Sequence, residues 1–339
     1  MRILIATPFV HKNEREALGV YAEGLLGAFV RAEHAVKIVS RSNVEKLLPQ
    51  GLRHVVYFVR LLPHVWKSDA VLALDTWSTG FPALLAARVL KRHFSIRIGG
   101  DFLWETYVER TKQEVRLSEF YNDRRMFSLK EKIVRRGIHW ITKRADALLF
   151  TTVFQKNIWQ KAYGFDEDRA HIIENYYPRK GELKEPAGHV FVSAGRDMYL
   201  KNVLRLKRAF GRVRNSEPDI VLDTRSLPYN EHLKRLDSAY AIIIPTFSEV
   251  CSNTAIEAVS RGKPFIMSND TGTSARLANC GLFIDTRKEE EFVSAITSIL
   301  DGTVYEKLER ACRSFSYEHS WEMIVDEIVT VINASQRVK

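Results

Sequence analysis

Residues 245–272 hold the pattern that decides the fold class, PTFSEVCSNTAIEAVSRGKPFIMSNDTG. An apolar run, Tyr240–Pro245, leads into this stretch, a helix-length segment, Thr254–Arg261, lies inside it, and a second apolar run, Pro264–Ser268, follows. Neither run alternates between apolar and polar residues, which is typical of parallel strands that helices cover on both faces. Strand, helix and strand in this order predict one unit of a parallel α/β sheet.

The same alternation runs through the whole chain. Short β-branched runs are followed by helix-length segments such as Gly19–Arg31 and Pro82–Arg92. The sequence therefore predicts an α/β fold built from doubly wound parallel sheets. The other expected strands are Arg2–Ala6, Ala35–Ser40, Ala70–Asp75, Ser95–Ile98, Asp146–Thr151, His171–Glu174, His189–Ala194, Asp219–Asp223 and Gly281–Asp285.

A break separates two series of strands at residues 176–189, YYPRKGELKEPAGH. This segment is rich in Pro, Gly and charge and shows no apolar period, so we interpret it as a linker. A chain of 339 residues is long enough for two domains. We expect a first domain over residues 1–178 and a second over 179–318, with ligands bound beyond the carboxyl ends of their strands.

Composition argues against several classes of protein. Apolar residues make up 45% of the chain and charged residues 27%, as in soluble globular proteins. The three cysteines form no Cys-x-x-Cys motif, which argues against a metal cluster or a disulfide framework and favours a reducing cytoplasm. The start, MRILIATPFV, is too short an apolar run for a secretory signal, and no segment approaches the ~18 apolar residues of a membrane span. We expect a soluble or surface-bound protein without a metal.

The net charge of +10 is unevenly spread. Residues 107–144 contain 11 Lys and Arg against 5 Asp and Glu, with aromatic and aliphatic side chains between them. Amphipathic helices with solvated basic faces explain this pattern. An anionic membrane surface, to which each nearby basic residue contributes about 1 kcal/mol, explains it as well, and so does a nucleic-acid footprint.

Two glycine-bearing corners follow strands of the first half. Gly19 stands near the start of a helix, either as a plain turn residue or where backbone approaches a phosphate or sugar. Gly99-Gly100-Asp101 follows a strand and predicts an exposed, mobile corner, in which Asp101 caps the next helix or accepts a hydrogen bond from a substrate hydroxyl. The chain contains neither G-x-G-x-x-G nor G-x-x-x-x-G-K-[ST], which argues against a dinucleotide enzyme and a P-loop NTPase.

Two cations stand at the beginning of the second half. A strand runs into Gly195-Arg196, and Lys201 follows five residues after Arg196, before a helix. A guanidinium and an ammonium together can offset the charge of a leaving nucleoside diphosphate. The alternative is that both are solvated surface charges.

Two glutamates of the opening stretch flank a helix start. Glu249 follows a buried strand, and Glu257 stands one turn into the helix, where it can accept from vicinal hydroxyls or form a capping box with Thr254. The helix dipole favours an anion at the intervening amides. A phosphate held by amides between two carboxylates is the pattern that a nucleotide sugar requires. The residues that supply these amides are Cys251, Ser252, Asn253 and Thr254.

With these residues the sequence resembles the retaining glycosyltransferases of family 4, which have the GT-B fold of two Rossmann-like domains facing each other across a cleft. The resemblance spans nearly the whole chain. Its segments are GVY at residues 19–21, HAVKIVS, RIGGDFLWE, ENYYP, SAGRDMYLKNV, PTFSEVCSNTAIEA, GKPFIMSNDTG and SYEHSWEMIVDEIV.

The resemblance implies a role for each candidate residue. Arg196 and Lys201 would contact the donor diphosphate, Glu249 the hydroxyls of the transferred sugar and Glu257 those of the ribose. The amides of residues 251–254 would bind sugar and phosphate. Gly19 would lie against the diphosphate, and Asp101 would lie near the reacting carbon. Residues 319–339 would form a helix that crosses back to the first domain.

The chain also departs from the family pattern. Family members usually carry an aromatic residue and a glycine at the positions of Cys251 and Ser252, and a histidine is common near Asp101. A strand-and-loop unit that helps to form the nucleobase pocket is trimmed after the helix that follows Lys201.

The implied activity is the transfer, with retention, of a sugar from a UDP- or GDP-sugar to a glycan or lipid-linked saccharide in cell-envelope polysaccharide or glycolipid synthesis. We expect Arg196, Lys201, Glu249 and Asp101 to be catalytic, without a metal or other cofactor. The basic segment predicts attachment to the anionic inner face of the cytoplasmic membrane, and no nucleic-acid partner. The alternatives are a nucleotide-sugar epimerase of the same architecture and a non-catalytic basic scaffold that binds membrane or nucleic acid.

Overall fold

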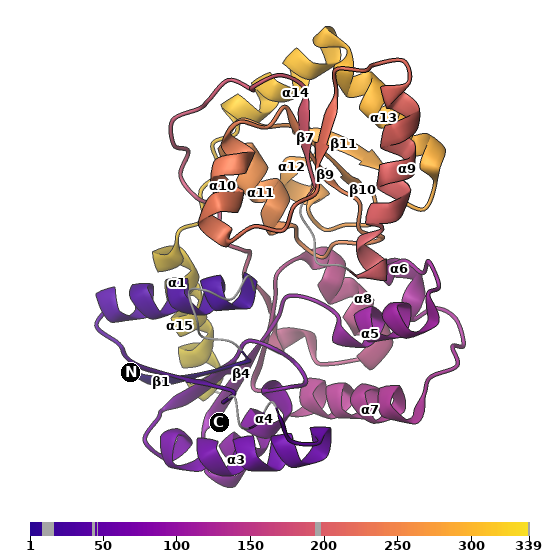
Figure 1. Ribbon diagram of the computed structural model, residues 1–339. Helices are drawn as coiled ribbons and strands as arrows, with labels where there is room; N and C mark the ends of the chain where they lie inside the picture. Colours follow the sequence, from indigo (N-terminus) through magenta and orange to yellow (C-terminus); the bar gives the residue numbers. More distant parts are fainter. Residues whose placement is uncertain (9–16, 43–44, 46, 194–197, 338–339) are drawn as a thin grey trace. The chain divides into compact units, whose positions relative to one another are not determined.

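The computed structural model describes residues 1–8, 17–42, 45, 47–193 and 198–337, and it divides into two compact units (Figure 1). Unit 1 contains Met1–Leu103, Arg125–Tyr176 and His319–Lys339. Unit 2 contains Trp104–Arg124 and Tyr177–Glu318. The chain therefore passes between the units four times, once on each side of residues 104–124 and once at each end of residues 177–318.

The sheet of unit 1 is parallel throughout. Among the described residues it has six strands in the order β2-β1-β3-β4-β5-β6. The chain runs from β1 outward to β2 and then crosses back to build β3, so the direction reverses once. Because such crossovers are right-handed, the reversal places the helix after β1 on one face and the helices after β2 and β3 on the other. The strands are β1, Arg2–Thr7; β2, Ala35–Ser40; β3, Ala70–Ala73; β4, His93–Ile98; β5, Ala147–Phe150; and β6, Ala170–Ile172.

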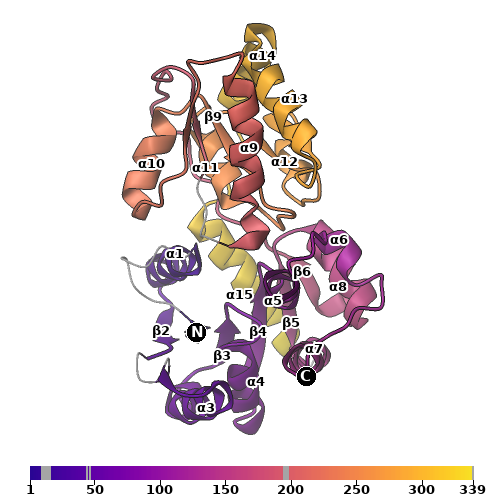
Figure 2. The same cartoon turned by 45° about the vertical axis from the view of Figure 1, so that its right-hand side comes forward.

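Helices cover both faces of this sheet (Figure 2). On one face, α1 (Ala17–Arg31) and the last helix, α15 (Trp321–Arg337), share an apolar core with β1, β3 and β5. Their contact is close, because a Cβ atom at Gly24 would overlap the indole of Trp321. On the other face, α3 and α7 both pack against α4. Other described helices of unit 1 are α3, Gln50–Trp66; α4, Gly80–Val89; α7, Leu129–Arg144; and α8, Val153–Tyr163.

The sheet of unit 2 is also parallel, with five strands in the described residues in the order β11-β10-β9-β7-β8. One apolar core lies between this sheet and α9 and α13, and a second lies between the sheet and α10 and α11. The strands are β7, Val190–Val192; β8, Val221–Asp223; β9, Ala241–Ile244; β10, Phe265–Ser268; and β11, Gly281–Ile284. The helices and the 3-10 turn η2 are η2, Tyr199–Lys201; α9, Val203–Arg214; α10, Tyr229–Asp237; α11, Asn253–Ser260; α12, Ser274–Leu277; α13, Glu289–Leu300; and α14, Gly302–Ser314.

The predicted fold class is confirmed, since both sheets are parallel and helices cover their two faces. Every expected strand is present within a few residues of its expected bounds. The bounds of the two units differ from the expected domains: Tyr177 and Pro178 belong to unit 2, and so does an earlier segment. The expected first domain, 1–178, includes residues 104–124, which belong to unit 2 in the structure. Helix α5 (Phe102–Thr111) leads into this segment, and the short helix α6 (Leu117–Phe120) lies within it. Among the described helices, none has the length and apolar character needed to span a bilayer.

Candidate functional site

The structure brings Lys201 and Glu249 together in unit 2. The Lys201 Nζ atom lies 3.1 Å from the Glu249 Oε1 atom and donates to the Thr246 hydroxyl at 3.4 Å. Both charged side chains keep some contact with solvent, at 25% and 18% exposure. Glu249 and Thr246 follow the carboxyl end of β9, so this ion pair lies at the edge of the sheet where ligands of open α/β folds bind.

The turn that carries Lys201 is fixed by its neighbour. Asn202 ends η2 in the left-handed region, with φ of 51°, and its side-chain amide donates to the Thr286 carbonyl oxygen at 2.6 Å. The Thr286 hydroxyl in turn donates to the Thr246 carbonyl oxygen at 3.0 Å. These bonds join η2 to the loops that follow β9 and β11, and they hold Lys201 beside the loop that carries Glu249.

The backbone of Glu249 is held from the other side. Its amide donates to the Asp270 carbonyl oxygen at 3.1 Å, and Glu249 forms an isolated parallel bridge with Thr271. The Gly272 amide donates to the carbonyl oxygens of Glu249 and Val250. The loop after β9 therefore runs alongside the loop after β10, and the position of Glu249 depends on both.

Residues 104–124, which we call the strap, form hydrogen bonds both with the turn that carries Lys201 and with the loop that carries Glu249. The Glu109 carboxylate accepts from the backbone amides of Tyr199 and Leu200, at 3.2 and 2.9 Å. The Leu117 amide donates at 2.9 Å to the hydroxyl of Ser248, the residue before Glu249. Further bonds from the strap to this edge join Ser118 to Asp270, Glu114 to Arg205, Arg116 to Asp285 and Glu119 to Arg287.

The start of α11 is built differently from the expectation. Ser252 is the N-cap residue, and its hydroxyl accepts from the Ala255 amide at 3.3 Å. The predicted capping box of Thr254 with Glu257 is therefore wrong, because the N-cap residue lies two residues before the expected cap. The Ser252 amide, expected to be open to a ligand, donates to the Thr273 hydroxyl at 2.9 Å. Cys251, Asn253 and Thr254 retain at least partial exposure around this helix start.

Glu257 lies in a mostly buried polar cluster. Its Oε1 atom accepts from the Tyr229 hydroxyl at 2.8 Å, and its Oε2 atom lies 3.8 Å from the His232 Nε2 atom. Burial raises the pKa of Glu257 to about 7, although Tyr229 and Arg261 act in the opposite direction. Burial, together with the charges of Arg235 and Arg261, lowers the pKa of His232 to about 4. Around pH 6 the Glu257 carboxyl group is therefore mostly protonated, and the His232 imidazole is neutral.

Asp101 is placed otherwise than predicted. Its carboxylate is 1% exposed and accepts from the Trp159 indole N–H at 2.9 Å, inside unit 1. The expected exposed corner is wrong for this side chain, because α8 brings a large aromatic ring over the end of β4. Gly19 also belongs to unit 1, where it is a buried residue of the first turn of α1. Arg196 lies outside the described residues.

A buried cation that the sequence did not single out lies four residues before Asp101 in the chain. Arg97, on β4, is 8% exposed, donates to the Asn175 side chain at 2.6 Å and stacks over the ring of Tyr21, with 3.9 Å between the guanidinium carbon and the ring centroid. The resemblance segment RIGGDFLWE begins with this residue, which was the available signal. Glu109 and Tyr229, also missed, carry no signal in the sequence, because their partners lie 28 to 91 residues away.

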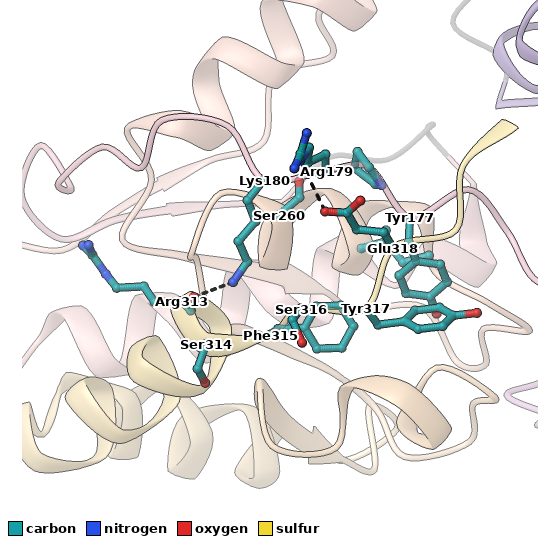
Figure 3. Close-up of a pocket in the computed structure, with 12 residues that line it drawn as sticks. Tyr177, Arg179, Lys180, Ser260, Arg313, Ser314, Phe315, Ser316, Tyr317 and Glu318 are labelled. Atoms are coloured by element: carbon teal, nitrogen blue, oxygen red, sulfur yellow. Dashed lines mark hydrogen bonds and ion pairs between the residues drawn. The ribbon is translucent and has the colours of Figure 1, made fainter. Parts of the chain in front are cut away.

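A separate cavity of about 300 Å³ lies in unit 2 beside the two chain passages at residues 176/177 and 318/319 (Figure 3). Ser260, at the last turn of α11, lines it, whereas the predicted ligand contacts stand at the first turn. The Lys180 Nζ atom donates to the carbonyl oxygens of Cys312 and Arg313, at 2.7 and 2.5 Å. Lys180 thus caps the end of α14, and burial lowers its pKa.

Several solved structures share this fold. Sucrose-phosphate synthase from Thermosynechococcus elongatus matches with a TM-score of 0.73 at 12% identity, over 100% of both chains. Anabaena HepE in complex with UDP-glucose matches with a TM-score of 0.66 at 12% identity, over 98% of this chain and 100% of that one. The lipopolysaccharide outer core galactosyltransferase WaaB matches with a TM-score of 0.65 at 15% identity, over 98% of this chain and 99% of that one.

No protein-family profile and no curated protein matches the chain. The likeness to solved structures is therefore one of fold, and the fold is that of the GT-B glycosyltransferases.

Proposed function

We propose that this protein is a retaining glycosyltransferase that takes a sugar from a UDP- or GDP-sugar. The observation that carries the proposal is the Lys201–Glu249 ion pair, at the carboxyl edge of the unit 2 sheet and close in sequence to the start of α11. Enzymes that transfer sugars need a cation for the departing diphosphate and an acceptor for sugar hydroxyls, and this pair supplies one of each. The likeness in fold to HepE, solved with UDP-glucose, supports the same donor class.

The proposed mechanism follows from the ion pair. In the absence of donor, Lys201 and Glu249 offset each other's charge. When the donor binds, the Lys201 ammonium turns to the diphosphate and stabilises the negative charge that develops as the glycosidic bond breaks. Glu249 then accepts from a hydroxyl of the transferred sugar and holds its anomeric carbon in place. Arg196 joins Lys201 on the diphosphate, a phosphate oxygen of the donor takes the proton of the acceptor hydroxyl, and no metal takes part.

Glu257 is proposed to bind the ribose. In the structure the Tyr229 hydroxyl donates to the Glu257 carboxylate at 2.8 Å, which is the hydrogen bond that a ribose hydroxyl would make. Binding of the nucleoside then replaces one hydroxyl donor by another.

The test is a screen of nucleotide sugars. Thermal unfolding is followed with UDP-, GDP- and ADP-sugars and with the free diphosphates, and sugar release is followed with and without an added glycan acceptor. We expect one nucleoside diphosphate to raise the unfolding temperature, and sugar transfer to require the acceptor. Conversion of the donor sugar without an acceptor would replace the proposal by an epimerase. Binding of nucleic acid or anionic lipid without a response to any nucleotide would replace it by a non-catalytic scaffold.

The acceptor is proposed to be a glycan or lipid-linked saccharide at an anionic membrane, on the inner face of which the protein binds peripherally. Helix α7 supports this proposal, because Leu129 and Ile133 are 76% and 51% exposed on a helix whose other exposed residues are largely basic. Its one carboxylate, Glu131, is buried in a capping box with Ser128. The exposed basic side chains of α7 are Lys130, Lys132, Arg135, Arg136, Lys143 and Arg144.

Vesicle flotation tests this attachment. We expect Arg135→Glu with Arg136→Glu to lower binding to anionic vesicles, and the effect to shrink at high salt because exposed charges are screened. Equal binding of the wild type to anionic and zwitterionic vesicles would contradict an electrostatic role for α7.

A further inference from the structure

The outward face of α3 is apolar from Leu52 to Trp66. Leu52, Val55, Val59 and Trp66 are 49%, 57%, 57% and 67% exposed. At 3.6 residues per turn these positions fall on one stripe, along a helix of 17 residues that is about 25 Å long. The inward positions are already satisfied, since Tyr57, Leu61 and Val65 are fully buried.

Scattered exposed apolar residues are ordinary on a protein surface, but a continuous stripe indicates an interaction site. Residues 51–66 place no carboxylate on the helix itself. Two carboxylates near α3 raise the pKa of Tyr57, and both already have partners in the protein. Glu45 is buried and lies 2.8 Å from Arg60, and Asp75 accepts from the Thr79 hydroxyl at 2.7 Å.

Basic side chains lie around the C-terminal end of α3. Lys37, Arg60 and Lys67 lie close enough to His64 that their charges, after burial, lower its pKa. A guanidinium nitrogen of Arg92 donates to the Trp66 carbonyl oxygen at 2.7 Å. Trp66 therefore stands at the boundary between an apolar stripe and a group of cations, the position that tryptophan takes at a membrane–water interface.

A second helix on the same face of the unit 1 sheet shows the same chemistry. Helix α7 combines exposed Leu129 and Ile133 with basic neighbours, and α3 and α7 both pack against α4 (Figure 1). Two separate helices of unit 1 thus present aliphatic side chains with a basic surround. A protein partner would not require this repetition, whereas an anionic lipid surface extends over both helices.

We propose that α3 lies in the plane of an anionic membrane and buries Leu52, Val55, Val59 and Trp66 among the acyl chains. The proposal deepens the membrane attachment of the proposed function, on which it rests, by adding an apolar anchor to the electrostatic one. Helices of this kind bind through their apolar area together with the attraction of basic residues to anionic lipid. The α7 charges bring the protein to the surface, and the α3 stripe holds it there.

The test uses vesicles of phosphatidylcholine with and without phosphatidylglycerol, at low and high salt. The variant Val55→Ser with Val59→Ser removes part of the stripe. The matched control is Val30→Ser with Val153→Ser, two valines of unit 1 that are 59% and 58% exposed on other helices. We expect the α3 variant to lose at least tenfold in vesicle partition, with most of the loss retained at high salt, and the control to bind as the wild type does. Trp66→Phe should reduce the vesicle-induced blue shift of the fluorescence.

Three results would overturn the inference. The first is equal partition of the α3 variant and the wild type. The second is a wild-type dimer in sedimentation that the α3 variant dissociates, without vesicle binding, which assigns the stripe to a second copy. The third is a blue shift of the same size in Trp66→Phe as in the wild type. Vesicle binding without any sugar transfer would instead overturn the proposed function and leave the membrane role of α3 in place.

Discussion

Charged side chains stay partly exposed at the carboxyl edge of the unit 2 sheet, whereas they are buried at the carboxyl edge of the unit 1 sheet. At the edge of unit 2, Lys201 and Glu249 pair with each other while both keep contact with solvent. At the edge of unit 1, Asp101 and Arg97 are 1% and 8% exposed; Asp101 accepts from the Trp159 indole, and Arg97 donates to the Asn175 side chain. An acid after a parallel strand is thus compatible with two roles. Exposure separates a group that can meet a ligand from one that holds the fold together.

The largest expected effect concerns the exposed pair. Lys201→Ala should lower turnover by a factor of 100 or more, because one preorganised contact to a developing negative charge contributes about 3 kcal/mol. Initial rates at saturating donor measure it. Lys207→Ala, which changes an exposed lysine of α9, is the matched control and should retain wild-type turnover. Near-normal turnover of Lys201→Ala would remove this ion pair from the mechanism.

A second prediction concerns Glu257. It belongs to unit 2, as Lys201 and Glu249 do, but its carboxylate is mostly buried, as that of Asp101 is. The folded pKa of about 7 lies above the value near 4.5 of an unfolded chain, so the unfolded state ionises first. The contribution of Glu257 to stability is therefore complete below pH 4.5 and is lost as the pH rises through 7. The loss is on the order of 3 kcal/mol.

Glu257→Gln measures this contribution. The free energy of unfolding of the wild type, minus that of the variant, should fall between pH 4.5 and 7, as followed by urea denaturation. His232 titrates in both proteins, so its opposite contribution largely cancels in the difference. Parallel stability curves over this range would mean that Glu257 ionises freely in the folded protein.

A third prediction concerns the buried edge. Asp101→Ala should destabilise the fold by about 2 kcal/mol, because the Trp159 indole N–H remains buried without its acceptor. The nucleotide affinity, measured by titration calorimetry, should stay unchanged. Asp101→Asn keeps an acceptor oxygen and should recover much of the stability. A large loss of turnover in a stable Asp101→Asn variant would return Asp101 to the catalytic residues.

The smallest effect is expected for the strap. Glu109→Ala frees the amides of Tyr199 and Leu200, so the turn that carries Lys201 should lose its position, with a fall in turnover of about tenfold, or ~1.4 kcal/mol. Lys112→Ala removes the exposed ion pair to Glu109 and the contact of Lys112 with the Tyr199 ring but leaves the amide bonds, so it is the control and should change little. If both variants lower turnover equally, the amide bonds do not position Lys201.

Much of the fold was predictable because its strands are buried on both faces. A run such as Ala241–Ile244 is entirely apolar, and its continuous pattern needs no knowledge of distant contacts. The chain passes between the units at 176/177, at the start of the segment interpreted as a linker, but residues 177–189 belong to unit 2. The candidate pair was predictable in part, since Lys201 and Glu249 each follow a strand of the second half and carboxyl ends of parallel strands share one edge.

The strap was not predictable. Residues 107–144 look like one basic segment, yet the structure divides them at 124/125, with the first part bound to unit 2 and the second forming part of unit 1. The ion pairs and amide bonds that hold the strap join residues 90 to 169 positions apart, and nothing in the local pattern marks them.

By itself the sequence determined the two parallel sheets, their order along the chain and the strand ends where charged residues gather, because apolar periodicity and turn chemistry are local. Only the tertiary structure decided which of those charges stay accessible. It buried Asp101 under Trp159, gave Glu257 the hydroxyl of Tyr229 and attached the strap to unit 2. It also left the apolar stripe of α3 uncovered. Burial and partnership are properties of packing between distant segments, and no local pattern specifies them.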